Sequence, residues 1–165
     1  MDKRPAQRGD VGIANGRTAI DETDRSILRH LLRDGRASMR QMGTELGLSP
    51  TTVASRVARL EKERVVRGYT GMVDSVTLGY DLTAVTEILV SKGKLLEMEK
   101  EIARIPNALA VYDVTGDTDA IIVSKFKNMD DLSVFTKKLL SMPYVERTNT
   151  HMVLTSIKED LRLSP

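Results

Sequence analysis

The chain has 165 residues, of which 41% are hydrophobic and 29% are charged, and it contains no cysteine. This composition supports a hydrophobic core and excludes a disordered chain, a fibre, a disulfide scaffold and a thiolate metal site. No apolar run approaches the roughly 18 residues of a membrane span, and the first residues lack the apolar centre of a signal peptide. We therefore expect a soluble, cytoplasmic protein.

Charge is distributed unevenly along the chain. Residues 1–68 carry 14 Lys/Arg against 9 Asp/Glu, whereas residues 69–165 carry 11 against 14. A basic first part joined to a mildly acidic remainder favours polyanion binding by the first part alone. Residues 1–19 show no periodicity and are predicted to form a flexible, solubilising tail. DNA contact is the alternative role for the four cations of this tail, Lys3, Arg4, Arg8 and Arg17.

Three short helices are predicted after the tail, over about 21–34, 38–46 and 50–64. Asp21 is placed to cap the first helix, and Ser38 with Gln41 has the capping-box spacing for the second. Gly47 permits the left-handed end of a helix, and Gly43 permits close approach of a neighbouring helix. The next helix starts within about four residues, so the pattern predicts a helix-turn-helix.

The third predicted helix has two chemically different faces. Val53, Val57 and Leu60 recur with helical spacing and predict a buried stripe. The other side has hydroxyls first and cations later, which fits a DNA major groove. The candidate DNA-binding residues are Ser49, Thr51, Thr52, Ser55, Arg56, Arg59 and Lys62. For Arg56 a salt bridge within the domain or a phosphate contact is favoured over base reading. The alternative for the whole helix is a solvated face in an all-α bundle.

An extended connection, including residues 65–69 and 72–73, leads into a second pattern. Strands are predicted at 82–91, 109–115, 119–127 and 145–156, with helices at 94–105 and 130–142. Each helix runs into a proline, Pro106 or Pro143, at a spacing of 37 residues. Two βαβ halves predict a ferredoxin-like sandwich with both helices on one face of the sheet. Apolar residues expected on the sheet's uncovered face are Val85, Leu89, Val111, Ile121 and Val123, and such a face predicts a homodimer.

The assembled motifs resemble the leucine-responsive/asparagine-regulator (Lrp/AsnC, feast/famine) family of transcription regulators. The resemblance covers about residues 20–158 and rests on Ile20-Asp21, Asp34-Gly35-Arg36-Ala37-Ser38, Leu46-Gly47-Leu48-Ser49, Arg56-Val57, Leu60-Glu61, Gly68-Tyr69, Leu78-Gly79, Gly116-Asp117-Thr118-Asp119 and Thr148-Asn149-Thr150. It implies an α+β chain in which a DNA-binding domain is joined by a linker to a ferredoxin-like domain that assembles oligomers and binds small effectors, usually amino acids. The expected segments are a tail (1–19), the helix-turn-helix domain (20–68), the linker (69–81), the βαββαβ domain (82–158) and a carboxy-terminal tail (159–165).

The effector site implied by the resemblance is a hairpin at a contact between dimers. Exposed amides of such a hairpin hold an α-carboxylate, and an aspartate accepts from an α-ammonium. The candidate effector-binding residues are Gly116, Asp117, Thr118, Asp119, Thr148 and Thr150. An ordinary turn and a solvated strand face are the alternatives for these residues. Two positions depart from the family: Arg64 stands where glycine is common, and Thr118 where an aromatic residue is common.

No catalytic residue, metal ligand or cofactor is predicted. His30 and His151 have no second histidine or cysteine near them in sequence, and the aspartates around the hairpin are typical of turns and strand ends. The leading hypothesis is a sequence-specific regulator of even oligomeric state that responds to an amino acid. Two rivals remain: an enzyme, because sirohaem decarboxylases resemble the same architecture, and an architectural protein that coats DNA without sequence preference.

Overall fold

The computed structural model describes residues 19–91, 93–163 and 165 and divides the chain into two compact units. Unit 1 contains the described residues up to Met72 together with those from Asp160 onward, and unit 2 is Val73–Glu159. The predicted basic tail lies outside the described residues apart from Ala19. None of the described helices is both long and apolar enough to cross a membrane.

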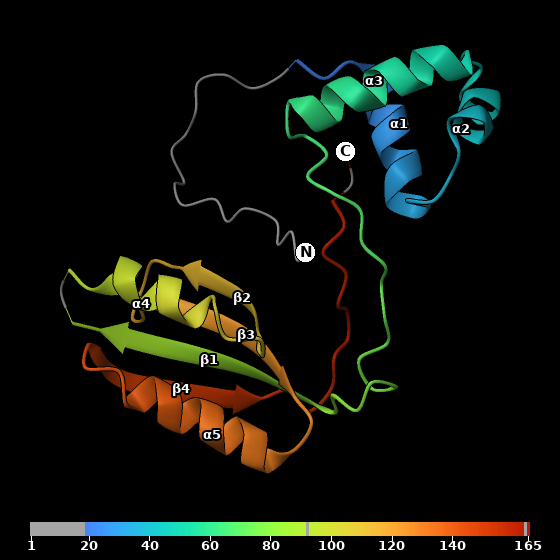
Figure 1. The fold of residues 1–165 in the computed structure, drawn as a ribbon. Helices are drawn as coiled ribbons and strands as arrows, with labels where there is room; N and C mark the ends of the chain where they lie inside the picture. Colours follow the sequence, from blue (N-terminus) through green and yellow to red (C-terminus); the bar gives the residue numbers. More distant parts are fainter. Residues whose placement is uncertain (1–18, 92, 164) are drawn as a thin grey trace. The chain divides into compact units, whose positions relative to one another are not determined.

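Unit 1 is built from three helices, α1 (Glu22–Arg33), α2 (Met39–Leu46) and α3 (Pro50–Lys62) (Figure 1). Each begins at its predicted cap, because Asp21 and Ser38 form capping boxes and the hydroxyl of Ser49 accepts from the amide of Thr52 at 3.0 Å. One apolar cluster joins them, formed by Ile27, Met42, Val53, Val57 and Leu60. The three-helix prediction is therefore confirmed.

The turn between α2 and α3 depends on two glycines. Gly47 is left-handed, with φ 67°, and the amide of Leu48 donates to the carbonyl of Gly43 at 2.8 Å. A Cβ at Gly43 would lie 2.7 Å from the carbonyl oxygen of Leu48, so only glycine lets the backbones approach this closely. Both sequence interpretations of these glycines are confirmed.

Arg64 follows α3 in the left-handed conformation, with φ 57°, and is the only non-glycine described residue with positive φ. Arg64→Gly is expected to raise the free energy of unfolding of unit 1 by about 0.5 to 1 kcal/mol. Glycine relieves the left-handed strain of the folded state, and this gain outweighs the extra conformational freedom that glycine has in the unfolded chain. Hydrogen exchange of α1 and α3 peptides in the full chain measures this change. Arg64→Ala is the control and keeps the strain, so equal protection in the two variants would contradict the prediction.

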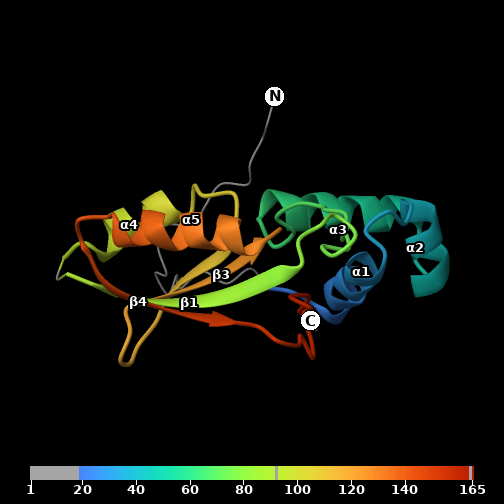
Figure 2. The same cartoon turned by 90° about the horizontal axis from the view of Figure 1, so that it is seen from below.

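Unit 2 contains β1 (Leu82–Val90), α4 (Leu95–Ile102), β2 (Ala108–Asp113), β3 (Ala120–Phe126), α5 (Met129–Leu140) and β4 (Val145–Met152). Neighbouring strands run antiparallel in the order β2-β3-β1-β4. Figure 2 shows both helices on one side of this sheet. The βαββαβ order and the helix layer confirm the predicted ferredoxin-like domain.

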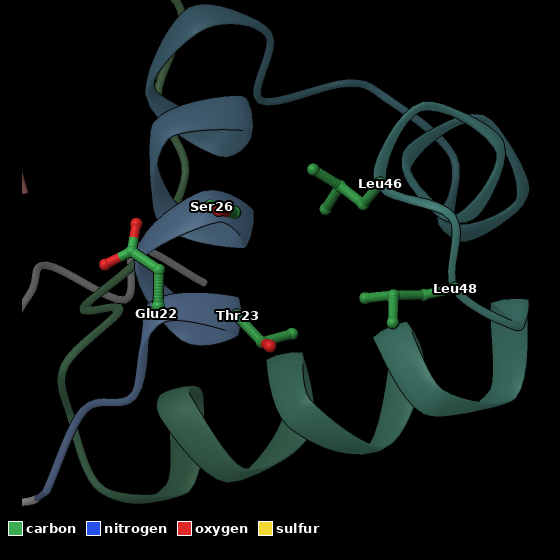
Figure 3. Close-up of a pocket in the computed structure, with 5 residues that line it drawn as sticks. All are labelled: Glu22, Thr23, Ser26, Leu46 and Leu48. Atoms are coloured by element: carbon green, nitrogen blue, oxygen red, sulfur yellow. The ribbon is translucent and has the colours of Figure 1, made fainter.

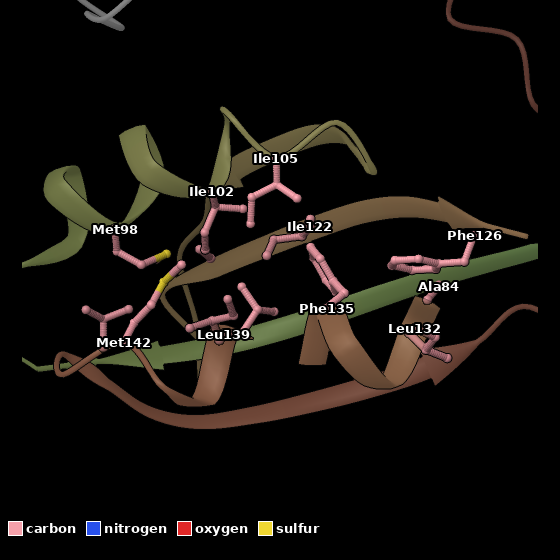
Figure 4. Close-up of a cluster of buried hydrophobic side chains, with 13 residues drawn as sticks. Ala84, Met98, Ile102, Ile105, Ile122, Phe126, Leu132, Phe135, Leu139 and Met142 are labelled. Atoms are coloured by element: carbon pink, nitrogen blue, oxygen red, sulfur yellow. The ribbon is translucent and has the colours of Figure 1, made fainter. Parts of the chain in front are cut away.

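The core of unit 2 lies between the sheet and its helices (Figure 4). Phe126 of β3 and Phe135 of α5 pack there with ring centroids 5.1 Å apart. Alternate residues of β1 and β3 are buried, so Val85, Leu89, Ile121 and Val123 lie on the uncovered face as predicted.

The prediction for Val111 is wrong. Val111 packs against the core on the helix-covered face and pairs with Ile122. A register shift between Ala108 and Ala110 adds one residue to β2 at this point. Because side chains alternate along a strand, one extra residue reverses the face of every residue that follows it.

Candidate nucleic-acid interface and effector loop

The side of α3 opposite its buried stripe is exposed along the whole helix. Three of the predicted residues, Thr51, Ser55 and Lys62, lie along its middle. Ala54 and Ala58 are also exposed and lie beside them, although neither was among the predicted residues. Helical spacing alone is sufficient to predict that both alanines lie on this side of α3. They were left out because only polar and charged residues were considered as DNA contacts. We define the outward face of α3 by its five residues: Thr51, Ala54, Ser55, Ala58 and Lys62.

Some hydroxyl groups of the candidate residues already form hydrogen bonds within the helix and its cap. The hydroxyls of Ser49 and Thr52 lie 2.8 Å apart, and the hydroxyl of Ser55 donates to the carbonyl of Thr52 at 3.0 Å. The hydroxyl oxygen of Ser55 keeps its capacity to accept. Ser49 is therefore chiefly a helix cap, and the first two turns of α3 present Thr51 and Ser55 to a partner.

Arg56 and Arg59 are held by two aspartates of α1 and its cap. Arg56 Nη1 donates to Asp21 Oδ2 at 2.5 Å and to Asp24 Oδ1 at 2.9 Å, and Arg59 donates to the other oxygen of Asp24. The Asp24 side chain is 0% exposed, whereas those of Arg56 and Arg59 are 30% and 40% exposed. This four-residue ion-pair network fixes α3 against α1, and the predicted salt bridge of Arg56 within its domain is confirmed.

The network keeps both carboxyls ionised. The hydrogen bond from Arg56 lowers the pKa of Asp21. For Asp24, burial by itself raises the pKa, but the hydrogen bonds from Arg59 and Arg56 outweigh it and the net direction is down. The same contacts raise the pKa of both arginines. Each guanidinium is therefore anchored to a carboxylate of unit 1 through one of its nitrogens.

Two arginines at the start of α2 are candidates for phosphate contact. Arg36 and Arg40 flank the amino-terminal cap of α2, and both are exposed without an ion pair among the described residues. The start of a helix favours a phosphate through its free amides and dipole, and flanking arginines add charge there. The helix-turn-helix pattern drew attention to α3 and left these two arginines unnoticed.

Unit 1 also has a shallow pocket of about 160 Å³ between α1 and the α2–α3 turn (Figure 3). Its lining residues are Glu22, Thr23, Ser26, Leu46 and Leu48. None of them belongs to the predicted DNA-binding set. The pocket therefore adds nothing to the outward face of α3.

The predicted effector hairpin joins β2 to β3 and is fastened to β1 by two of its four candidate residues. Asp119 accepts from the amide of Val90 at 2.7 Å, and the hydroxyl of Thr118 donates to the carbonyl of Ile88 at 2.8 Å. Gly116 has φ 127°, a conformation that favours glycine, and Gly116 and Asp117 are exposed. Thr118 and Asp119 therefore shape the hairpin, while Gly116 and Asp117 are the pair available to a ligand.

The two candidate threonines of β4 lie across β1 from the hairpin. Thr148 pairs with Ile88, and the hydroxyl of Thr150 lies 3.1 Å from that of Thr86. Because Ile88 and Thr86 are buried, their directly opposite partners share the helix-covered face. The hairpin and Thr148 thus approach Ile88 from opposite sides of β1. Thr150 lies further along β4, where its hydroxyl contacts Thr86.

A carboxylate that sequence reasoning missed lies on α4. One oxygen of Glu99 is buried without a hydrogen-bond partner among the residues that the structure describes. Burial, followed by repulsion from Asp113 at the end of β2, raises the pKa of Glu99. Residues 99 and 113 are linked only by the tertiary packing of α4 on β2, so no sequence spacing signals the pair.

Both units match family models. Residues 20–61 match the AsnC-type helix-turn-helix domain, and residues 83–163 match the Lrp/AsnC ligand binding domain. An uncharacterised HTH-type transcriptional regulator of Pyrococcus abyssi is 42% identical over 146 residues, which cover 88% of this chain and 99% of that protein. The HTH-type transcriptional regulator FL11 of Pyrococcus horikoshii is 33% identical over 89% of this chain and 97% of its own length.

Solved structures agree with these matches. A transcriptional regulator of Neisseria meningitidis in complex with L-methionine superposes with a TM-score of 0.82 at 27% identity, covering 88% of this chain and 96% of that one. A feast or famine regulatory protein of M. tuberculosis, complexed with L-methionine, superposes with a TM-score of 0.79 at 26% identity, covering 89% and 100%.

Proposed function

We propose that this chain, which belongs to the Lrp/AsnC family of transcriptional regulators, reads operator DNA with the outward face of α3. The observation that carries the proposal is the separation of faces on α3. Val53, Val57 and Leu60 are buried, while Thr51, Ser55 and Lys62 stand exposed on the other side. A helix of this kind lies in the major groove with its first turns at the base edges and its last turn at the backbone.

We assign three roles to the residues of unit 1. Thr51 and Ser55 contact base edges, since they lie on the outward face in the first turns of α3, while the hydroxyl of Thr52 stays with Ser49 at the cap. Three exposed cations outside the ion-pair network contact phosphates, namely Lys62, Arg36 and Arg40. Arg56 and Arg59 position α3 through Asp24, and Ser49 caps it.

Lys62→Ala is expected to weaken binding to specific and random duplexes alike, by about three- to tenfold, and to lower the salt slope by about one. Ser55→Ala is expected to reduce the preference for specific DNA by about fivefold, because one base contact is lost. Fluorescence anisotropy with the DNA upstream of the chain's own coding sequence, against a random duplex at fixed salt, measures both effects. Ser26→Ala, on α1, is the matched hydroxyl control.

The same measurement separates the rival functions. Equal binding of the unchanged chain to both duplexes would favour the architectural DNA-coating protein. An unchanged preference in Ser55→Ala would remove Ser55 from the base-reading set. We expect no enzymatic activity, and both histidines have polar neighbours that support structural roles. His30 lies 3.3 Å from Glu45, and His151 lies 3.0 Å from Asn149.

Unit 2 is proposed to bind an amino acid at the hairpin, within an oligomer interface. The exposed amides and the Asp117 carboxylate are suited to the two charged groups that all free α-amino acids share. The L-methionine complexes of two relatives support this class of ligand. A ligand held between subunits stabilises one assembly and so changes the spacing at which helix-turn-helix pairs meet DNA.

Asp117→Asn is expected to weaken amino-acid binding about tenfold, because it removes the charge that faces the α-ammonium. Isothermal titration with L-methionine, followed by other amino acids, measures the loss. Asp130→Asn, at the exposed start of α5, is the matched control. If Asp117→Asn binds as tightly as the unchanged chain, the ligand does not sit at Asp117.

A homodimer is proposed to form through the uncovered sheet face. Apolar side chains of three strands continue across it, namely Val85, Leu89, Ile121, Val123 and Tyr112. A sheet face of this kind pairs readily with its own copy. Sedimentation equilibrium measures the oligomeric state, and a monomer at all concentrations would exclude the interface. We place this regulator in the cytoplasm.

A further inference from the structure

The outward face of α3 combines methyl groups and hydroxyls with a single cation. Thr51, Ala54, Ser55, Ala58 and Lys62 follow the spacing i, i+3, i+4, i+7 and i+11, so they form one continuous surface. Lys62 is the last residue of the helix and lies about three turns from Thr51. The part of the face that reaches base edges is therefore uncharged.

The two arginines of α3 are held by carboxylates of unit 1, which directs them away from the outward face. Arginine bound to O6 and N7 is the commonest reader of guanine. In this chain Asp24 binds Arg56 and Arg59 simultaneously, and Asp21 binds Arg56 as well. Asp24 is fully buried, so releasing both arginines would leave an unpaired carboxylate inside unit 1. That cost exceeds what a single base contact returns.

The remaining groups suit thymine. The C5 methyl of thymine projects into the major groove and packs against small apolar side chains such as alanine and the methyl of threonine. Ala54 and Ala58 offer such methyls, and their small size lets the helix approach the base edges closely. The hydroxyl of Thr51 serves either a donor or an acceptor on the adjacent base, whereas that of Ser55 donates to the carbonyl of Thr52 and accepts from a base donor.

We propose that α3 reads its half-site through thymine methyls, and that it makes no arginine contact with guanine. The inference rests on the proposed DNA-reading function and specifies its base chemistry. The expected half-site has A·T pairs with major-groove methyls beneath Ala54 and Ala58. Any guanine within the half-site is tolerated without being read at N7.

The test starts from a duplex selected by the full chain from a random library. That duplex is then prepared with deoxyuridine for half-site thymines, which removes only the methyls, and separately with 7-deazaguanine for half-site guanines, which removes N7. Anisotropy at fixed salt is expected to show about tenfold weaker binding for the deoxyuridine duplex. The 7-deazaguanine duplex, and one with deoxyuridine only between the half-sites, are expected to stay within about twofold.

Matched variants connect the effect to the alanines. For Ala54→Gly and Ala58→Gly we expect a smaller ratio of the affinity for the thymine duplex to the affinity for the deoxyuridine duplex. A loss of binding that is equal for both duplexes leaves this ratio unchanged. A tenfold loss with 7-deazaguanine and none with deoxyuridine would overturn the inference, since an arginine would then read guanine. Failure to select any preferred duplex would instead overturn the proposed sequence-specific function itself.

Discussion

Asp24→Ala is expected to lower the free energy of unfolding of unit 1 by about 2 to 4 kcal/mol. The buried carboxylate accepts from Arg56 and Arg59, and it also accepts from the amide of Asp21 at 3.1 Å. Its removal leaves two arginines without their common partner and a void beneath α3. Both arginines retain some exposure to water, which keeps the loss below that of a fully buried pair.

Hydrogen exchange of α1 and α3 peptides in the full chain measures this loss separately from unit 2. Glu22→Ala is the matched control, because Glu22 lies on the same helix but is 72% exposed and, within the described part of the chain, pairs only with Arg29. Its effect is expected to stay within about 0.5 kcal/mol. Equal effects of the two substitutions would show that the ion-pair network does not hold α3.

The same network predicts a direction of pH dependence. Since the folded pKa values of Asp21 and Asp24 lie below the ordinary 3.8, their contribution is complete above that value and is lost as pH falls through the folded pKa. The difference in stability between the unchanged chain and Asp24→Ala should therefore be constant near neutral pH. It should narrow only in acid below about pH 4.

Local chemistry accounts for the parts of the fold that could be predicted from sequence. Asp21, Ser38, Ser49 and Gly47 act within three or four residues of their partners, so helix ends follow directly from residue types. The face of Val111 could not be predicted in this way. A register shift next to Ala110 decides it, and nothing in the alternation of β2 signals that shift.

Partners distant in sequence account for the rest of the site. Arg59 falls on the flank of a helical wheel and resembles a DNA contact, but its carboxylate partner stands 35 residues earlier. Thr118 and Asp119 resemble ligand-binding residues, but they fasten the hairpin to β1 about 30 residues away. In both cases the sequence periodicity predicts the direction of a side chain, whereas its hydrogen-bond partner is known only from the folded structure.

Gly43→Ala is expected to destabilise unit 1 by about 1 to 3 kcal/mol and to abolish specific DNA binding. In an open helix this substitution stabilises by about 1 kcal/mol, so the predicted sign is reversed. The reversal follows from the contacts of the new Cβ, which would lie 2.7 Å from the Leu48 carbonyl oxygen and 3.3 Å from the nitrogen of Pro50. Both are backbone atoms of the turn, and relief requires α3 to move away from α2.

Gly35→Ala is the matched control, because its Cβ would meet its nearest neighbours at 3.7 Å, an ordinary contact, and Gly35 has no positive φ. Hydrogen exchange gives the stability of each variant, and anisotropy gives its specific binding. If Gly43→Ala retains specific binding and gains stability, the spacing of α2 and α3 is not the quantity that sets DNA recognition. A loss of specific binding that exceeds the loss of stability would show that this spacing positions the outward face of α3 in the groove.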